Sequence, residues 1–214
     1  MARASAATTR WSISRTDLHA RITLEETPLF ADPSGALYWP GRKTLVVADA
    51  DFAPRASLAK LQLLVRRYAP ARVVCLGPAR ALQALAPPDW IFLADGTAIA
   101  EDKLVLRHKP TSSEALGFGE IVGSFRPRAA LETKLGRIEG ACFALDGRRM
   151  AMPAFGDELG GTDARSPAIG RLFGRARARV LLLGRDRLQM ISRDRLVPLA
   201  ALRASGNTPS NRAI

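Results

Sequence analysis

Short apolar runs recur through the first half of the chain, and each run ends in a polar or glycine-containing segment. The runs occupy residues 45–48, 73–76 and 91–94. Continuous apolar runs of this kind are typical of strands that are buried on both faces. Between the first two runs, apolar residues recur at steps of three and four, at Leu58, Leu61, Leu64, Val65 and Tyr68. That spacing predicts an amphipathic helix between two buried strands.

The second half of the chain is richer in short strand-like runs separated by glycine and proline. We predict strands at 104–107, 120–123, 141–145, 149–152, 179–183 and 188–191. Asp146-Gly147 has the composition of a hairpin turn between two of these strands. Near the N-terminus, residues 22–24 and 36–39 are predicted to pair around the Asp-Pro-Ser-Gly turn at 32–35.

The order of the elements, with a helix between strands first and mostly strands afterwards, predicts an α/β fold with two sheets in one domain. We expect the sheets to face each other, with helices outside. A chain of 214 residues with 47% hydrophobic content is long enough to bury a substantial core. The domain is predicted to span residues 21–204, with flexible tails at 1–20 and 205–214.

Composition narrows the expected cellular setting. No apolar run approaches about 18 residues, so no membrane-spanning helix is predicted. Residues 1–10 contain no acid, but no apolar segment follows them as it would in a secretory signal. Cys75 and Cys142 each lie within an apolar run, and buried free thiols are favoured over a disulfide. These features predict a cytoplasmic protein without a membrane partner.

Positive charge is concentrated near the C-terminus. The formal net charge is +12, and residues 165–214 contain 11 arginines against two aspartates. Arginine suits phosphate because its planar fork of donors matches the phosphate oxygens. One interpretation is a stripe that follows a nucleic-acid backbone, formed by Arg171, Arg175, Arg177, Arg179, Arg185 and Arg187. The alternative is an Arg-rich genome, in which arginine replaces lysine on solvated surfaces.

Several unusual strings occur in a characteristic order. They are DPSGALYWP at 32–40, CFALDGRR at 142–149, MPAFG at 152–156 and LGRDR at 183–187. In this order they resemble the calcineurin-like metallophosphoesterase superfamily, and more closely its bacterial branch of ligase-associated DNA damage response endonucleases (PdeM-type). The resemblance runs from about residue 32 to about residue 197 and implies a four-layer αββα sandwich.

Members of this superfamily hold two divalent metals with side chains at the ends of strands, and the metals generate a hydroxide and clamp the phosphate. In this chain Asp49 and His108 match two of the ligands, and Asp51 stands where the first motif has a His. The remaining motif positions hold Pro78 for the bridging Asp, Gly96 for the Asn, Thr97 for the general-acid His, and Ser124 and Arg126 for the last two His.

These substitutions predict that the two-metal centre is largely lost. The favoured interpretation is a non-catalytic binding or assembly role without a cofactor, with DNA or DNA-repair proteins as partners. Arg126 brings a cation to a metal position, where we expect it to pair with Asp49 or Asp51. Asp49 and His108 also have an ordinary structural interpretation, as a turn cap and a solvated side chain.

Two functional alternatives remain open. One is an active or weakly active phosphoesterase or endonuclease that binds a single Mn²⁺ or Mg²⁺ through Asp49, Asp51 and His108, because carboxylates can ligate a hard metal. The other is a basic nucleic-acid-binding protein that uses the arginines near the C-terminus. The sequence predicts no particular oligomeric state.

Overall fold

The computed structural model describes residues 19–50, 54–111, 118–156, 160–173, 178–184 and 188–199, which form two sheets and three α-helices. The first sheet has the order β1 (Ala20–Leu24), β2 (Thr27–Ala31), β3 (Leu37–Trp39), β4 (Thr44–Ala48), β5 (Arg72–Leu76), β6 (Ile91–Leu93). The second has the order β13 (Thr162–Asp163), β10 (Pro127–Thr133), β11 (Gly136–Leu145), β12 (Arg149–Ala151), β9 (Gly119–Val122), β8 (Leu104–Arg107), β7 (Ala98–Glu101). In addition, β14 (Arg179–Leu183) pairs with β11 and with β15 (Leu188–Ser192). The helices are α1 (Pro54–Tyr68), α2 (Arg80–Gln83) and α3 (Pro167–Phe173), with 3-10 turns η1 (Pro40–Arg42) and η3 (Arg193–Arg195).

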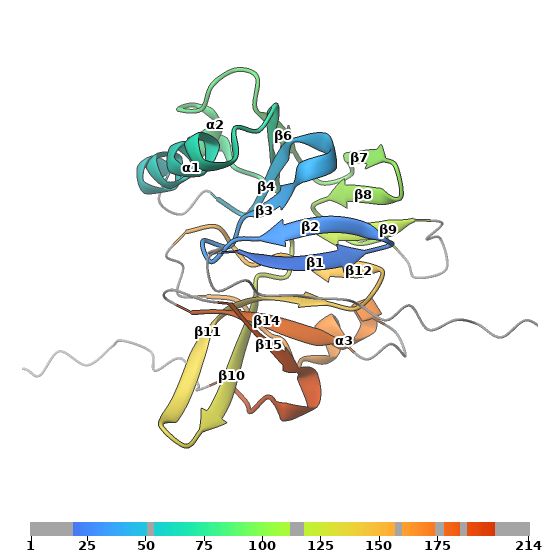
Figure 1. Ribbon diagram of the computed structural model, residues 1–214. Coiled ribbons are helices and arrows are strands. Elements are labelled where there is room, and N and C mark those ends of the chain that lie inside the picture. Colours follow the sequence, from blue (N-terminus) through green and yellow to red (C-terminus); the bar gives the residue numbers. More distant parts are fainter. Residues whose placement is uncertain are drawn as a thin grey trace, which may run out of the picture.

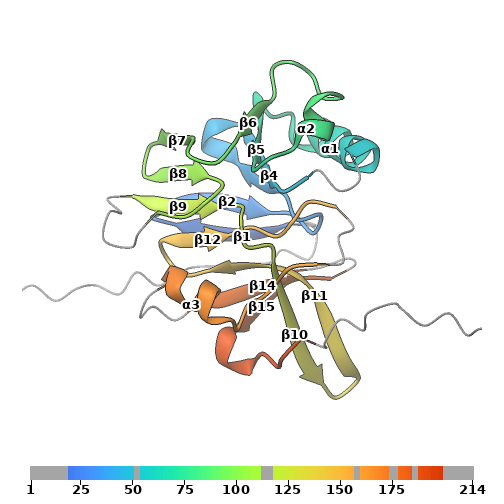
Figure 2. The ribbon, with the colours of Figure 1, turned by 180° about the vertical axis from the view of Figure 1, so that it is seen from behind.

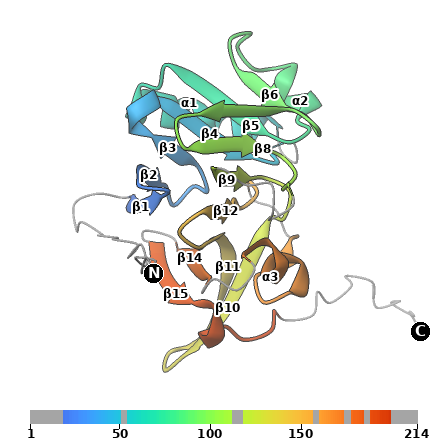
Figure 3. The ribbon, with the colours of Figure 1, turned by 90° about the vertical axis from the view of Figure 1, so that its right-hand side faces the viewer.

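The two sheets face each other, and helices cover their outer faces. Along β4, Val46 and Ala48 lie in the core between the sheets, whereas Leu45 and Val47 pack on the other face with Leu61 of α1. This period of two is the one expected of a strand that is buried on both sides. Figures 1 and 3 show α1 and α2 at one end of the molecule and α3 at the other, with the sheets between them. The predicted α/β fold with αββα layers is confirmed.

The second sheet repeats the arrangement with its own helix. On β14, Leu181 lies in the core between the sheets, while Val180 and Leu182 pack on the outer face. Ile169 and Leu172 of α3 belong to that outer cluster. The short helix α3 is therefore held on the sheet by apolar burial, which stabilises far more than the propensity of seven residues could.

The N-terminal pairing differs from the prediction. Residues 22–24 pair with β2, and the turn at 32–35 joins β2 to β3 instead. The strand β2 was not predicted because the turn before it is Glu25-Glu26, which carries no turn signal in the sequence. Both glutamates have left-handed backbones, with φ of 44° and 64°, where glycine and asparagine are usual.

The hairpin of β10 and β11 also extends beyond the predicted strands. The predicted strand at 141–145 is only the buried end of β11, whose first residues, from Gly136, are exposed. Figure 2 shows this hairpin projecting past the body of the sandwich. Exposed residues need no apolar pattern, so the first half of β11 gave no strand signal.

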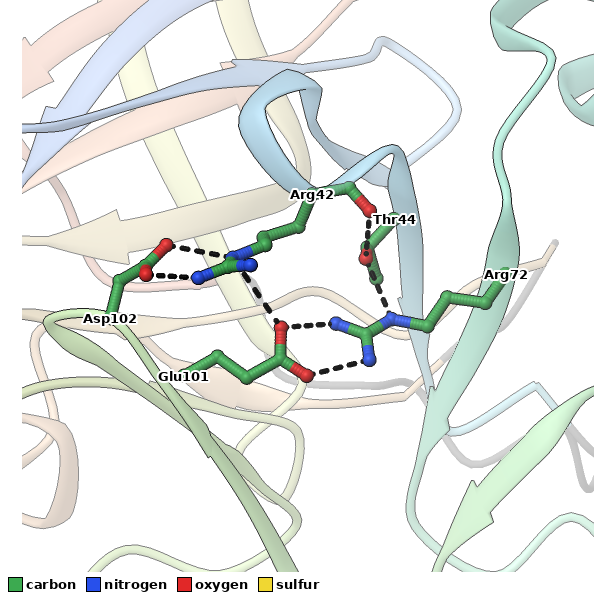
Figure 4. Close-up of polar contacts among 5 residues, drawn as sticks. All are labelled: Arg42, Thr44, Arg72, Glu101 and Asp102. Carbon is green, nitrogen blue, oxygen red and sulfur yellow. Dashed lines mark hydrogen bonds and ion pairs between the residues drawn. The ribbon is translucent and has the colours of Figure 1, made fainter.

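Ion pairs join the two sheets at the end of β7. The guanidinium of Arg72 donates to both carboxylate oxygens of Glu101 at 2.6 Å, and its Nε donates to Oγ1 of Thr44 at 2.8 Å (Figure 4). Arg42 Nε donates to Oδ2 of Asp102 at 2.8 Å. The hydrogen bonds from Arg72 are the main reason that the pKa of Glu101 lies below its usual value. We call these five residues the clasp.

Other expectations can be placed in the same structure. Cys75 and Cys142 are buried free thiols, and burial raises the pKa of Cys75 to about 12. Among the described residues, no helix is both long enough and apolar enough to cross a membrane. The predicted tails at 1–20 and 205–214 fall almost wholly outside the described residues, and β1 begins at Ala20.

Candidate functional site

The carboxyl ends of strands from both sheets meet at one edge of the sandwich. In the first sheet β4, β5 and β6 are parallel, so Asp49, Gly77 and Asp95 follow their ends at the same edge. In the second sheet β8 and β9 are parallel, and His108 and Ser124 follow them. The backbone N–H of Ser124 donates to the carbonyl of His108 at 3.0 Å, which fixes these two strand ends together.

Asp49 lies at the centre of an ion-pair cluster at this edge. Its side chain is 3% exposed, and each carboxylate oxygen faces a nitrogen atom. Oδ2 accepts a hydrogen bond from Nε of Arg126 at 2.8 Å, and Oδ1 lies 3.2 Å from Nε2 of His108. Asp49 has a left-handed backbone with φ of 47°, which Asp tolerates better than most residues. The expected contact of Arg126 with a first-motif carboxylate is therefore present, with Asp49.

His108 extends the cluster to two further residues. Its Nδ1 lies 2.5 Å from Oδ1 of Asp95, whose other oxygen lies 2.5 Å from Nζ of Lys109. The hydrogen bond to Asp49 is the main reason that the pKa of His108 is raised above 6.5, with burial opposing the shift and Asp95 adding to it. Lys109 and then His108 lower the pKa of Asp95. Charges therefore alternate along a chain of five side chains, which we call the ion-pair chain: Lys109, Asp95, His108, Asp49 and Arg126.

Two glycines allow this edge to close. A Cβ on Gly77 would lie 2.7 Å from Oδ1 of Asp49 and 2.8 Å from Cδ2 of His108. A Cβ on Gly123 would lie 2.8 Å from Cβ of Leu76, in the opposite sheet. Contacts this short are essentially never observed, so a side chain at either position would force the sheets or the ion-pair chain apart. Both glycines are needed for the observed geometry.

The other predicted site residues lie near this edge without joining the ion-pair chain. Pro78 follows Gly77 and is exposed. Gly96 and Thr97 lie in the exposed turn after β6, where Oγ1 of Thr97 donates to the carbonyl of Ala94 at 2.8 Å. Asp51 falls outside the described residues.

Asp95 and Lys109 were not predicted as members of the site. Each is a direct chain neighbour of a motif position, and that adjacency was the only signal in the sequence.

The donors in the described part of this edge do not fit a two-metal centre. A ligand must offer a lone pair to the metal at about 2.0–2.6 Å, but both oxygens of Asp49 and both ring nitrogens of His108 face charged partners within 3.2 Å. The guanidinium of Arg126 also places a fixed positive charge where a cation would be repelled. Over the described ranges, no three His, Cys, Asp or Glu side chains form a group that could hold a metal ion.

Comparisons with known proteins bear on this arrangement. No family model matches the sequence, and no curated protein is similar to it. Among solved structures, the chain is similar to the crystal structure of Pseudomonas putida nuclease MPE, with a TM-score of 0.60 and 20% identity over 81% of this chain and 100% of that chain. The chain therefore shares the fold of that structure. At this identity the likeness concerns the fold alone, so the superfamily and the endonuclease branch that the sequence strings indicate stay predictions.

The arginines predicted as a nucleic-acid stripe are only partly described. Arg171 on α3 and Arg179 at the start of β14 are exposed. The remaining members fall outside the described residues: Arg175, Arg177, Arg185 and Arg187. The nucleic-acid stripe therefore stays a prediction.

Replacing Arg126 by alanine is expected to lower the free energy of unfolding by about 2 kcal/mol, because Asp49 loses a charged hydrogen-bond donor and stays buried. Urea denaturation at neutral pH measures the change. Asp49→Asn combined with Arg126→Ala should cost less than the sum of the single changes, since the two side chains are in contact.

Lys103→Ala is the matched control for this measurement. Lys103 also pairs with a carboxylate, that of Glu26, but the two side chains are 59% and 79% exposed. Such an exposed pair contributes little to stability, because solvent screens both charges. If Arg126→Ala costs no more than Lys103→Ala, the bond between Arg126 and Asp49 does not stabilise the edge.

Proposed function

We propose that this protein is a DNA-binding member of the ligase-associated endonuclease branch in which fixed cations have replaced the metals, so that it binds DNA without hydrolysing it. The observation that carries the proposal is the 2.8 Å hydrogen bond from Arg126 to Asp49. It joins two motif positions and uses a carboxylate oxygen that a metal would need. His108 uses the other oxygen, so binding a single Mn²⁺ or Mg²⁺ at Asp49 would require both partners to move.

The charge of the edge supports binding of phosphate rather than of a metal. With His108 protonated, the ion-pair chain contains three cations and two carboxylates. Lys109 and Arg126, at its two ends, have side chains that are 63% and 34% exposed. Together with the net charge of +12, they give this edge a surface that attracts a phosphate backbone.

Hydrolysis of a phosphodiester by this protein is expected to remain at background when Mn²⁺ is added. The metal contributions that stabilise the transition state require ligands that the described edge does not offer. The assay compares the protein with Asp49→Ala, using bis-p-nitrophenyl phosphate and linear and nicked DNA. Asp49→Ala should leave the rate unchanged. Strong hydrolysis that disappears in Asp49→Ala would contradict the proposal and favour the single-metal enzyme.

DNA binding is expected to be independent of sequence and to weaken steeply between about 50 mM and about 200 mM salt, because binding releases counterions from the backbone. Fluorescence anisotropy with a labelled duplex measures the salt slope. Lys109→Ala and Arg179→Ala should each reduce that slope by about 0.9 for every phosphate contact removed. No binding at the lower salt would contradict a DNA-binding role.

Arg66→Ala is the matched control for the DNA titration. Arg66 is an exposed arginine on α1, in the opposite outer layer from α3, and its removal changes the net charge by the same amount. Its salt slope should equal that of the unaltered protein. Equal losses in all three variants would mean that DNA responds to net charge alone, with no particular contribution from Lys109 at the edge or from Arg179 in the stripe.

A further inference from the structure

A cavity of about 280 Å³ lies between α3 and the segments that follow β8 and β9. Arg149 and Arg171 line it, together with the apolar side chains of Pro110, Phe125 and Leu172. Its size is at the lower limit of small-molecule sites, roughly 300 Å³. It therefore suits one compact ligand and excludes a nucleic-acid duplex.

Arg149 forms the buried side of the cavity, and one nitrogen atom of its guanidinium group has no hydrogen-bond partner. Arg149 is only 4% exposed. Nη1 donates to the carbonyl of Leu172 at 2.8 Å and Nη2 to that of Thr111 at 3.1 Å. Nε lies 3.4 Å from Oε2 of Glu120, and neither atom has a hydrogen-bond partner. Burial lowers the pKa of Arg149, and the negative charges of Glu120 and Asp146 oppose this shift.

Among the described residues, positive side chains outnumber carboxylates around the cavity. Glu120 is fully buried and also faces Arg107, with Nε of Arg107 at 3.3 Å from Oε1. One carboxylate is thus shared by two guanidinium groups. Arg171 adds a third positive charge at the exposed side, and no acidic side chain of the described ranges is recorded as its ion-pair partner. An anion entering the cavity would meet this excess of positive charge.

We propose that this cavity binds a small organic anion, with its phosphate or carboxylate group near Arg149 and Arg171 and a flat apolar body against Phe125 and Leu172. Guanidinium groups bind both oxyanions through paired hydrogen bonds. The excess of positive charge excludes a metal ion. The site uses none of the side chains of the ion-pair chain, so it stands or falls independently of DNA binding at the edge.

Isothermal titration calorimetry with adenosine 5′-monophosphate, benzoate and adenosine tests the site. Adenosine 5′-monophosphate or benzoate should bind with one ligand per chain, and adenosine should bind at least about tenfold more weakly than its monophosphate. Whichever of adenosine 5′-monophosphate and benzoate binds more tightly identifies the preferred anionic group as phosphate or carboxylate. Arg171→Ala should weaken binding by about tenfold, equivalent to about 1.4 kcal/mol.

Three variants complete the experiment. Arg171 is exposed, so its removal should leave the melting temperature unchanged, whereas Arg149 is too deeply buried for a clean binding variant. Phe125→Ala should weaken binding of the organic anion but not of inorganic phosphate. Arg66→Ala, which changes the net charge by the same amount on α1, should bind like the unaltered protein.

Several results would overturn the site. They are no binding of either anion, unchanged binding in Arg171→Ala, an equal loss in Arg66→Ala, and adenosine that binds as tightly as its monophosphate.

Discussion

Gly77→Ala is expected to lower the free energy of unfolding by about 4 kcal/mol, one of the largest effects of any single methyl group added to this protein. Two costs add at this position. The backbone has φ of +113°, which costs an L-residue about 1–3 kcal/mol. The new Cβ would also lie 2.7 Å from Oδ1 of Asp49 and 2.8 Å from Cδ2 of His108, and overpacking of this kind costs about 1–3 kcal/mol. Urea denaturation followed by circular dichroism measures the loss.

Gly136→Ala separates these two costs. Gly136 has nearly the same φ, +111°, but a Cβ there would meet nothing within 4 Å. It should show the backbone cost alone, about 1–3 kcal/mol. The difference between the two variants is the cost of intruding on the ion-pair chain. If Gly77→Ala and Gly136→Ala lowered the free energy of unfolding equally, Asp49 and His108 could move away from the new Cβ without cost, and they would not be held in their observed positions.

Arg149→Ala is expected to cost about 3–5 kcal/mol. Glu120 has no exposed surface, and removal of Arg149 would leave it in the interior with only Arg107 and one backbone donor. Two carbonyl groups, those of Leu172 and Thr111, would also lose their donor. Denaturant unfolding measures the loss.

Arg148→Ala tests whether burial is the cause. Arg148 is the adjacent residue and also has a carboxylate partner, Glu25, but its side chain is 53% exposed. Its replacement should cost about 1 kcal/mol or less. Glu120→Leu combined with Arg149→Met should recover much of the loss, because an apolar pair removes both buried charges. A double variant as unstable as Arg149→Ala would show that the cost comes from packing instead of charge.

The sequence predicted those elements whose burial imposes a pattern. β4 and β5 are buried along nearly their whole length, and α1 buries one stripe, so each had a strong apolar signal. The exposed half of β11 and the strand β2 had none. The Glu25-Glu26 turn shows the limit most clearly, since its left-handed backbone is set by the pairing of β1 with β2 and not by residues that favour it.

The sequence predicted which positions meet at the site, but it predicted only part of the contacts between their side chains. The carboxyl ends of the parallel strands in the two facing sheets meet at one edge whatever residues they carry, so the meeting of Asp49, His108 and Arg126 followed from the fold. Asp95 and Lys109 could not be found in this way, because their roles depend on side-chain positions: Asp95 contacts Nδ1 of His108, and Lys109 contacts Asp95. The cavity beside Arg149 had no sequence signal at all, since it depends on how α3 seats on the second sheet.

The clasp and the ion-pair chain lie at opposite ends of one strand. β8 begins just after Asp102, which Arg42 holds, and it ends just before His108, which Asp49 and Asp95 hold. Leu104 and Leu106 between them lie in the core. A slip of one residue would turn both leucines to the wrong face and separate Asp102 and His108 from their partners at the same time. A misaligned β8 would therefore lose ion pairs at both of its ends as well as the burial of its leucines, so only the observed register keeps all of these contacts.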